Sequence, residues 1–177
     1  MNRLSSTLIA IAAAVGAAST VSAQSTKPVS LGISAGAAIP ISDLANDYST
    51  GYNGTVSLGF NSYGSPLGFR IDGMYNALSA KSGVNLPDVK ISSANANLVY
   101  ALPGTGIRPY LIGGAGIYGL KSDLNGSSTI TKLGLNGGIG ASFPLSGFNT
   151  FVEARLHHVF SDNVATQFIP VTFGISF

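Results

Sequence analysis

The stretch Gln167-Phe168-Ile169-Pro170-Val171-Thr172-Phe173-Gly174-Ile175-Ser176-Phe177 decides the fold of this chain. Apolar residues recur at every second position from Ile169 to Phe177, with proline, small or polar residues between them. This period of two is typical of a β-strand whose faces differ. An apolar strand at a free sheet edge invites aggregation, whereas a strand that closes a barrel has no free edge and can face lipid. The alternative is a buried edge strand of a soluble β-sandwich.

The N-terminal segment, residues 1–23, has the features of a secretory signal peptide. A basic start at Arg3 is followed by an apolar run from Leu8 to Ala18 and by small residues up to Ala23. The run is shorter than the roughly 20 residues that a spanning helix needs. Cleavage is therefore expected after Ala23, which leaves residues 24–177 as one outer-membrane domain. An uncleaved anchor is the alternative.

Composition excludes several classes of function. Charged residues make up 9% of the chain, against roughly 25% in ordinary soluble domains. The net charge of +2 gives no support to nucleic-acid binding. There is no cysteine, so the chain uses neither disulfides nor thiolate chemistry. No Cys/His cluster, phosphate-binding loop or nucleotide fingerprint is present, and neither a metal nor a cofactor is expected.

Period-two alternation recurs in eight blocks of about ten residues. The blocks are 28–40, 52–60, 67–77, 91–102, 108–120, 131–143, 150–160 and 167–177. Short connections with proline alternate with longer polar connections, which are 41–51, 78–88, 121–130 and 161–166. This pattern predicts an all-β fold, an eight-stranded antiparallel transmembrane β-barrel with short periplasmic turns and longer outer loops. The block 108–120 cannot be oriented, because both of its faces are apolar or glycine.

The less apolar face of the blocks indicates the lumen. It consists mainly of Ser, Gly, Asn and Thr. Such small residues suit an eight-stranded barrel, which is only wide enough for side chains to fill it. The aliphatic and aromatic face then points to lipid. Seven aromatic residues near block ends share this outward side and are expected to form girdles at the two membrane interfaces: Tyr52, Phe60, Tyr75, Tyr100, Phe143, Phe160 and Phe177.

Four segments resemble the family of small outer-membrane β-barrel proteins, which includes OmpA-like and OmpX-like eight-stranded barrels. They are Gly36–Pro40, Phe69–Tyr75, Pro109–Gly116 and the terminal Phe177. The resemblance implies a monomer in the outer membrane of a Gram-negative bacterium, among outer-membrane lipid and lipopolysaccharide. It also implies delivery by periplasmic chaperones and the barrel assembly machinery, with an assembly signal at Phe173, Ile175 and Phe177. No wall-binding domain is expected after Phe177, and hence no wall-anchoring role.

Five ionisable residues fall at the alternate strand positions that form the lumen face: Arg70, Asp72, Glu153, Arg155 and His157. They lie in the third and seventh blocks, which face each other in an eight-stranded barrel. Arg70 is therefore expected to meet Glu153 across the lumen, with Asp72 near Arg155. A charge in a narrow barrel is costly unless it is paired. The cluster is expected to be a structural plug, and the alternative is a gate whose pairs rearrange to pass ions.

A lipid hydrolase would need Ser, His and an acid together on one lipid-accessible surface. Because residues alternate between the two faces of a strand, Glu153 and His157 are expected to point inward and His158 outward. Ser161 lies in the following loop. Adjacent strand residues face opposite sides, so His157 and His158 do not form a metal pair. No catalytic residue is assigned. The expected function is a structural role in the envelope or a surface interaction through the loops. A narrow channel is the main alternative, and a lipid-modifying enzyme is the third.

Overall fold

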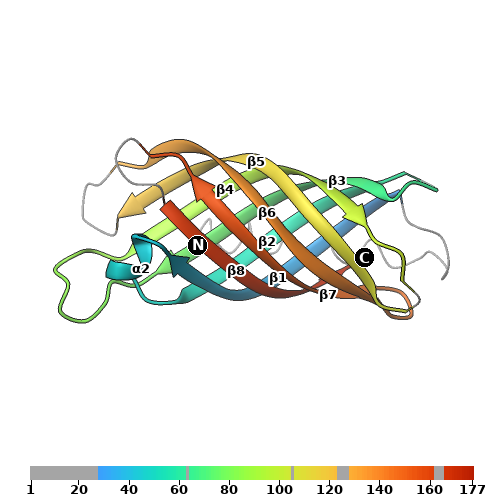
Figure 1. Ribbon diagram of the computed structural model, residues 1–177, viewed down its shortest axis with the longest axis horizontal. Coiled ribbons are helices and arrows are strands. Elements are labelled where there is room, and N and C mark those ends of the chain that lie inside the picture. The colour runs from blue at the N-terminus through green and yellow to red at the C-terminus, as the bar shows by residue number, and fades with distance from the viewer. Residues whose placement is uncertain (1–27, 63, 105, 123–127, 162–165) are drawn as a thin grey trace, which may run out of the picture.

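Eight antiparallel strands close into a barrel (Figure 1). The computed structural model describes residues 28–62, 64–104, 106–122, 128–161 and 166–177. The strands are β1 (Val29–Ile41), β2 (Gly51–Asn61), β3 (Leu67–Leu78), β4 (Val89–Ala101), β5 (Arg108–Ser122), β6 (Ile130–Pro144), β7 (Asn149–Val159) and β8 (Thr166–Ser176). Each strand pairs with its neighbours in the chain, and β8 pairs with β1 to close the sheet. The predicted eight-stranded architecture is confirmed.

The strand ends differ from the predicted blocks by a few residues. β4 begins at Val89 rather than Ile91, and β5 ends at Ser122 rather than Leu120, because polar residues at these ends obscure the alternation. A single-turn helix, α2 (Leu44–Asp47), lies between β1 and β2. Among the described residues, no helix is long and apolar enough to cross a bilayer. The predicted signal peptide and parts of the connections 121–130 and 161–166 lie outside the described residues.

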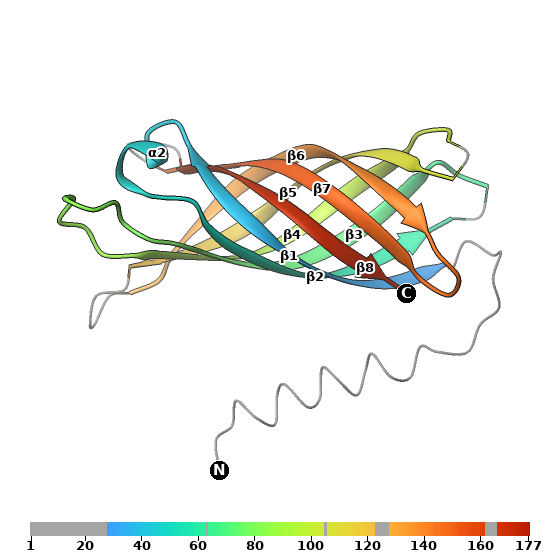
Figure 2. The same cartoon turned by 90° about the horizontal axis from the view of Figure 1, so that it is seen from below.

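The two ends of the barrel differ in the length of their connections. The short turns lie at one end, where β1 begins and β8 ends (Figure 2). The longer connections, with α2 and the hairpin loop between β3 and β4, lie at the other (Figures 1 and 2). We call these the turn end and the loop end. This asymmetry agrees with the predicted alternation of short and long connections.

The outer face of the barrel is apolar. Leu133 is 66% exposed, Ile139 63% and Leu98 62%, and other exposed aliphatic and aromatic residues lie on every strand. Large contiguous apolar surfaces of this kind mark contact with lipid or with another protein. The inward positions of the same strands carry the buried polar residues. The sequence-based assignment of the two faces is therefore confirmed.

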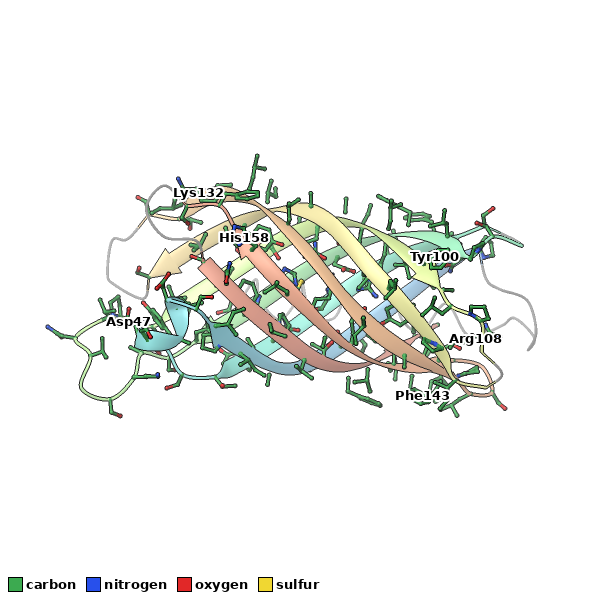
Figure 3. The ribbon with its side chains drawn as sticks, viewed as in Figure 1. Asp47, Tyr100, Arg108, Lys132, Phe143 and His158 are labelled. Carbon is green, nitrogen blue, oxygen red and sulfur yellow. The ribbon has the colours of Figure 1, made fainter. Side chains whose placement is uncertain are left out.

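Aromatic side chains lie at both rims of the outer face. The rings of Tyr52 and Tyr75 are 6.4 Å apart toward the loop end, and those of Phe60 and Phe69 are 6.2 Å apart toward the turn end. Figure 3 shows Tyr100 near the turn end as well. Aromatic residues collect at the interfaces between lipid and water, so the two rims match a span across one bilayer.

The structure resolves the orientation of β5. Tyr110, Ile112 and Tyr118 are buried in the lumen, whereas Leu111 is exposed outside. Tyr110 faces Gly140 of β6 in the register, and a Cβ atom at Gly140 would lie 2.2 Å from Tyr110 Cζ. The inward ring therefore depends on a glycine of the neighbouring strand, and the pattern of β5 alone contains no such information.

Candidate functional site in the lumen

Four charged side chains form a closed ring in the lumen. We call Arg70, Asp72, Glu153 and Arg155 the lumen ring. Arg70 Nη2 lies 2.8 Å from Glu153 Oε1, and Arg70 Nε lies 3.0 Å from Asp72 Oδ1. Arg155 Nη1 lies 2.7 Å from Asp72 Oδ2, and Arg155 Nε lies 2.8 Å from Glu153 Oε1. Each cation contacts both anions, so the formal charges of the ring cancel.

Strand alternation explains how these residues meet. Arg70 and Asp72 are two positions apart on β3, and Glu153 and Arg155 are two positions apart on β7, so all four point to the same side of their strands. Their side chains are 13%, 0%, 3% and 4% exposed, in that order. Gly138 of β6 faces Arg155, and a Cβ atom there would lie 2.7 Å from Arg155 Cγ. The structure thus brings together both expected pairs, Arg70 with Glu153 and Asp72 with Arg155.

Two neutral side chains complete the ring. Tyr110 Oη donates a hydrogen bond to Glu153 Oε2 at 2.7 Å, and Asn97 Nδ2 donates one to Asp72 Oδ2 at 2.9 Å. Such bonds offset part of the free energy that is lost when charges leave water. Tyr110 cannot be assigned from the sequence, because the pattern of β5 does not orient that strand. Alternation along β4 turns Asn97 inward but gives no reason to connect it with Asp72.

His157 lies beside the lumen ring rather than in it. Its Nδ1 lies 2.8 Å from Tyr118 Oη, and its imidazole stacks on Phe168 with ring centroids 5.0 Å apart at an interplanar angle of 11°. Its side chain points inward, as predicted, and its described hydrogen bond and ring contacts are to Tyr118 and Phe168 rather than to the four charges. His157 lies further toward the loop end than Arg155, and its neighbours there are aromatic.

An apolar cluster, which we call the apolar cap, lies in the lumen at the loop end. Six residues form it, each 0–1% exposed: Ala38, Leu78, Ile91, Tyr118, Val159 and Phe168. Leu44 and Tyr48, from the connection that contains α2, pack against this cluster. The expectation that the inner face is small and polar is therefore wrong at this end. The sequence pattern places Leu78 in the connection 78–88, but it is the last residue of β3.

The connection that contains α2 is fixed over the apolar cap. Tyr48 forms an antiparallel β-bridge with Ala80, in the loop between β3 and β4. Lys81 Nζ donates a hydrogen bond to the backbone oxygen of Ala45 at 2.6 Å. Burial raises the pKa of Tyr48, and the carboxylates of Asp47 and Asp88 add to the effect. These contacts join the first two loops into one cover.

The two histidines lie on opposite faces, as expected. His158 Nδ1 lies 2.7 Å from Gln167 Nε2 on the outer side, and its ring packs edge-on against Phe160 with centroids 5.1 Å apart. Within the described parts of the chain, no group of three His, Cys, Asp or Glu side chains could hold a metal ion. The hydrogen bonds described for His157 and His158 end on a tyrosine and a glutamine, not on a serine or a carboxylate.

Comparisons with known proteins agree with this architecture. Among solved structures, Neisserial surface protein A gives a TM-score of 0.70 at 19% identity, covering 86% of this chain and 98% of that chain. Ail, the attachment invasion locus protein of Yersinia pestis, gives a TM-score of 0.54 at 19% identity. This match covers 84% of this chain and 97% of the Ail chain. The outer membrane enzyme PagL gives a TM-score of 0.53 at 17% identity. This match covers 84% of this chain and 98% of the PagL chain. At these identities the likeness shows the fold alone.

Comparison with curated proteins gives no match. Residues 8–177, however, match the family described as the outer membrane protein beta-barrel domain. This match spans every strand of the barrel. The apolar outer face is therefore the surface that contacts lipid in the outer membrane. The chain belongs to the outer membrane protein beta-barrel domain family.

Proposed function

We propose that this protein is a non-enzymatic structural component of the outer membrane, with a closed lumen and with its loop end on the outer surface. The observation that carries the proposal is that buried side chains cluster at two levels of the lumen. The lumen ring joins β3 to β7, and the apolar cap lies at the loop end. An ion that crosses the barrel would have to pass both.

The lumen ring is costly to open. Removing one partner of a buried ion pair leaves an uncompensated charge and typically costs about 3–5 kcal/mol. Each member of this ring has two charged partners. The apolar cap adds a second barrier, because buried apolar side chains give an ion no polar group in place of its hydration shell. The arrangement supports a plug rather than a permanent pore.

A narrow gated channel is the second candidate, and one observation favours it. Several buried polar atoms have no hydrogen-bond partner among the described residues: Asn95 Oδ1, Asn97 Oδ1 and His157 Nε2. These side chains all belong to the inner face. They could solvate an ion if the lumen ring and the apolar cap opened together.

An enzymatic role is the third candidate, since PagL is described as an outer membrane enzyme and shares this fold. The proposal of a non-enzymatic role rests on the two histidines. His157 is enclosed in the lumen against Tyr118, and His158 is hydrogen-bonded to Gln167 on the outer side. Neither arrangement presents a serine activated by a histidine and an acid.

The same proposal includes the expected partners. Periplasmic chaperones and the barrel assembly machinery would deliver the chain, and outer-membrane lipid and lipopolysaccharide would surround a monomer. The apolar face around the whole barrel and the paired terminal Phe177 support this part of the proposal.

Conductance in planar lipid bilayers tests the closed lumen. We expect no regular unit conductance from the purified wild-type protein. The double variant Arg155→Ala with Phe168→Ala, which opens both levels, is expected to produce conducting events. Folding of both proteins is verified by a change in gel mobility on boiling. Reproducible unit conductance from the folded wild type would contradict the proposal and favour the channel.

A further inference from the structure

The chain turns over the mouth of the barrel at Ser42, directly after β1 ends at Ile41. Ser42 has a φ of 52°, and among the described residues it alone combines a side chain with a positive φ. This left-handed region is unfavourable for a residue that has a Cβ atom. The corner at Ser42 is therefore strained, and other contacts must hold it in place.

A side-chain hydrogen bond fixes this corner to the neighbouring strand. Ser42 Oγ donates to Gln167 Oε1 of β8 at 2.6 Å. Gln167 is itself held, because its Nε2 lies 2.7 Å from His158 Nδ1 on β7. Ile41 and Gln167 are partners in the register, so the bond lies where the pairing of β1 with β8 ends. The corner is thus tied through one glutamine to two strands of the wall.

Beyond the corner, the two loops of the cover, residues 42–50 and 79–88, hold together as one unit. Ser49 N donates a hydrogen bond to Ser79 O at 2.9 Å. Lys81 N donates one to Asp47 O at 2.8 Å, in addition to the contact of the Lys81 ammonium group described above. Movement about Ser42 would therefore carry both loops together, without breaking the bonds between them.

Opposing contributions set the position of the cover. Leu44 and Tyr48 pack against the apolar cap, and the hydrogen bond to Gln167 holds the corner, so both favour closure. The strained backbone of Ser42 favours opening, because this residue can leave the left-handed region once the corner is free. Loss of the side-chain bond at the corner would then shift the equilibrium toward an open form.

We propose that the cover is a lid over the apolar cap, with Ser42 as its hinge and Gln167 as its latch. In the closed form the latch holds Ser42 in its strained conformation. In the open form the hinge relaxes, Leu44 and Tyr48 leave the apolar cap, and the buried side chains of the cap become accessible. The inference rests on the contacts of the cover, and it holds whether or not the lumen conducts ions.

Labelling of a buried cysteine tests the lid, because the chain contains no cysteine of its own. Ala38→Cys places a thiol in the apolar cap, and N-ethylmaleimide is added to the folded full-length protein in detergent. We expect slow labelling in this background. Addition of Gln167→Met, which removes the latch with little change in length, should make labelling about fivefold faster, as expected for the loss of one hydrogen bond. Ile91→Cys is a second reporter in the apolar cap.

Two substitutions at Ser42 separate the latch from the strain. Ser42→Ala removes the hydroxyl group but keeps a side chain in the left-handed region, so labelling of the reporter should rise about as much as with Gln167→Met. Ser42→Gly removes the hydroxyl group and the strain together, because glycine adopts a positive φ readily. The closed form is then less strained, and the rise in labelling should be smaller.

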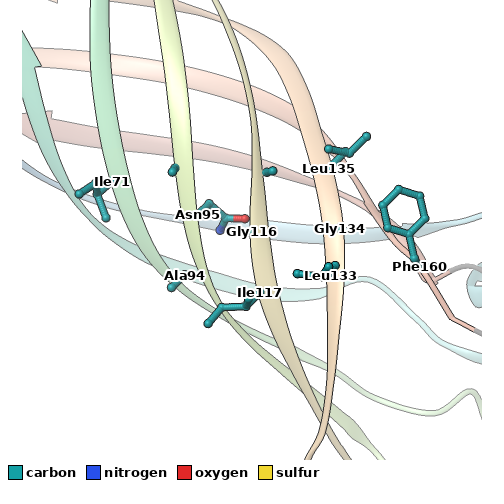
Figure 4. A pocket seen from close by; sticks show the side chains of 11 residues that line it. Ile71, Ala94, Asn95, Gly116, Ile117, Leu133, Gly134, Leu135 and Phe160 are labelled. Atoms are coloured by element: carbon teal, nitrogen blue, oxygen red, sulfur yellow. The ribbon is translucent and has the colours of Figure 1, made fainter.

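Two controls complete the experiment, and gel mobility before and after boiling verifies that each protein is folded. Lys81→Met removes a hydrogen bond within the cover and should change labelling little, because the backbone bonds between the two loops remain. Ala94→Cys places the thiol on the outer face, among the residues that line the groove in Figure 4. This thiol should react at the same rate with and without Gln167→Met.

Four results would overturn the proposal. The first is equal labelling of Ala38→Cys with and without Gln167→Met. The second is an equally large effect of Lys81→Met, which would place the opening at the other side of the cover. The third is a matching rise at Ala94→Cys, which would indicate general loosening of the barrel. The fourth is equal labelling in Ser42→Ala and Ser42→Gly, which would exclude Ser42 as a strained hinge. Bilayer conductance tests the closed lumen separately.

Discussion

Arg70 of β3 and Glu153 of β7 lie 83 positions apart in the chain, yet their side chains meet at 2.8 Å in the lumen. The two strands are not neighbours in the sheet. The contact therefore joins opposite walls of the barrel and forms one side of the lumen ring. Because each member has two charged partners, the removal of one residue leaves two others incompletely paired.

A double-mutant cycle should reveal this coupling. We expect Arg70→Met and Glu153→Gln each to lower the free energy of unfolding by about 3–5 kcal/mol, because each leaves buried charge uncompensated. The double variant should cost less than the sum of the two by about 1–3 kcal/mol. Urea unfolding in lipid vesicles gives the values. Arg108→Met, at the exposed turn end, is the control and should change stability by less than about 0.5 kcal/mol. Additive effects would mean that the two side chains do not interact.

Exchange of the two charges gives a further test of the ring. Arg70→Glu combined with Glu153→Arg keeps their mutual attraction but places a carboxylate beside Asp72 and a guanidinium beside Arg155. We therefore expect this double variant to remain less stable than the wild type, although more stable than either single variant. Exchange of all four charges should recover more stability than exchange of two. Unfolding midpoints in urea provide the comparison, and no gain from the double exchange over the singles would show that the cross-lumen pair is wrong.

The apolar cap should be important for stability. Phe168→Ala is expected to cost about 3–5 kcal/mol, because it leaves a cavity under His157 and Tyr118. Phe69→Ala, on the lipid-facing side, removes the same ring and should cost less. Unfolding of both variants in vesicles of the same lipid makes the comparison direct. Equal losses would indicate that Phe168 contributes no more than a side chain in contact with lipid.

A methyl group at Gly140 should displace Tyr110. The Cβ atom would lie 2.2 Å from Tyr110 Cζ, so the ring must move away from Glu153. We expect Gly140→Ala to destabilise the barrel by about 1–3 kcal/mol. At Gly73, in contrast, no atom lies within 4 Å of an added Cβ. Gly73→Ala is thus a matched control and should be nearly neutral, and a similar loss in both variants would point to a general backbone effect.

The cover over the apolar cap should loosen in alkali. The pKa of Tyr48 is raised above its ordinary value of 10.0, so the folded state favours the neutral phenol. The neutral phenol of Tyr48 therefore contributes fully to stability when the pH is below the ordinary pKa of tyrosine. This contribution is lost as the pH rises through the raised pKa. Cleavage by trypsin after Lys81 should therefore increase in strongly alkaline solution. Tyr48→Phe removes the ionising group and should weaken this dependence, and an unchanged dependence would rule out Tyr48 as its source.

Assembly in cells should depend on Phe177 more than stability does. The Phe177 ring lies 6.2 Å from that of Phe148, centroid to centroid, so Phe177→Ala removes a ring contact as well as the predicted signal. Phe148→Ala removes the same contact and leaves the signal intact. We expect both variants to refold similarly in vitro, but only Phe177→Ala to lower the amount of protein in the outer membrane. Equal amounts of the two variants in isolated outer membranes would argue against the assembly role.

The strand pattern could be predicted from the sequence because lipid and lumen impose opposite preferences on alternate positions. Arg70 and Glu153 could be paired because both lie a few residues after a short turn on strands that face each other. β5 could not be oriented by this rule, since its inner and outer faces are equally apolar. Its orientation depends on space left by Gly140 on another strand, and a single strand's pattern does not encode its neighbour's register.

The apolar cap cannot be predicted from the alternation alone, for a different physical reason. The alternation predicts one polar environment for the whole lumen, whereas the polarity of the lumen changes along the barrel axis. Leu78 and Phe168 both fall at inward positions in the alternation of their strands. Their apolar side chains at these positions are the sequence feature that indicates an apolar lumen at this end. Alternation predicts the face of His157 but not its height in the barrel, so it does not predict the contacts with Tyr118 and Phe168. Its aromatic neighbours come from other strands.

The pairing of β1 with β8 constrains the order of folding. Leu31 and Phe177 exchange two backbone hydrogen bonds, from Leu31 N to Phe177 O at 3.2 Å and from Phe177 N to Leu31 O at 2.9 Å. Until β8 arrives, the free edge of β1 would carry unsatisfied amides, and each such group costs several kcal/mol in hydrocarbon. Strands that enter lipid one at a time would meet this penalty at every stage. Insertion should therefore be concerted, with the sheet closing as it crosses the bilayer, and a chain truncated before β8 should remain outside the membrane.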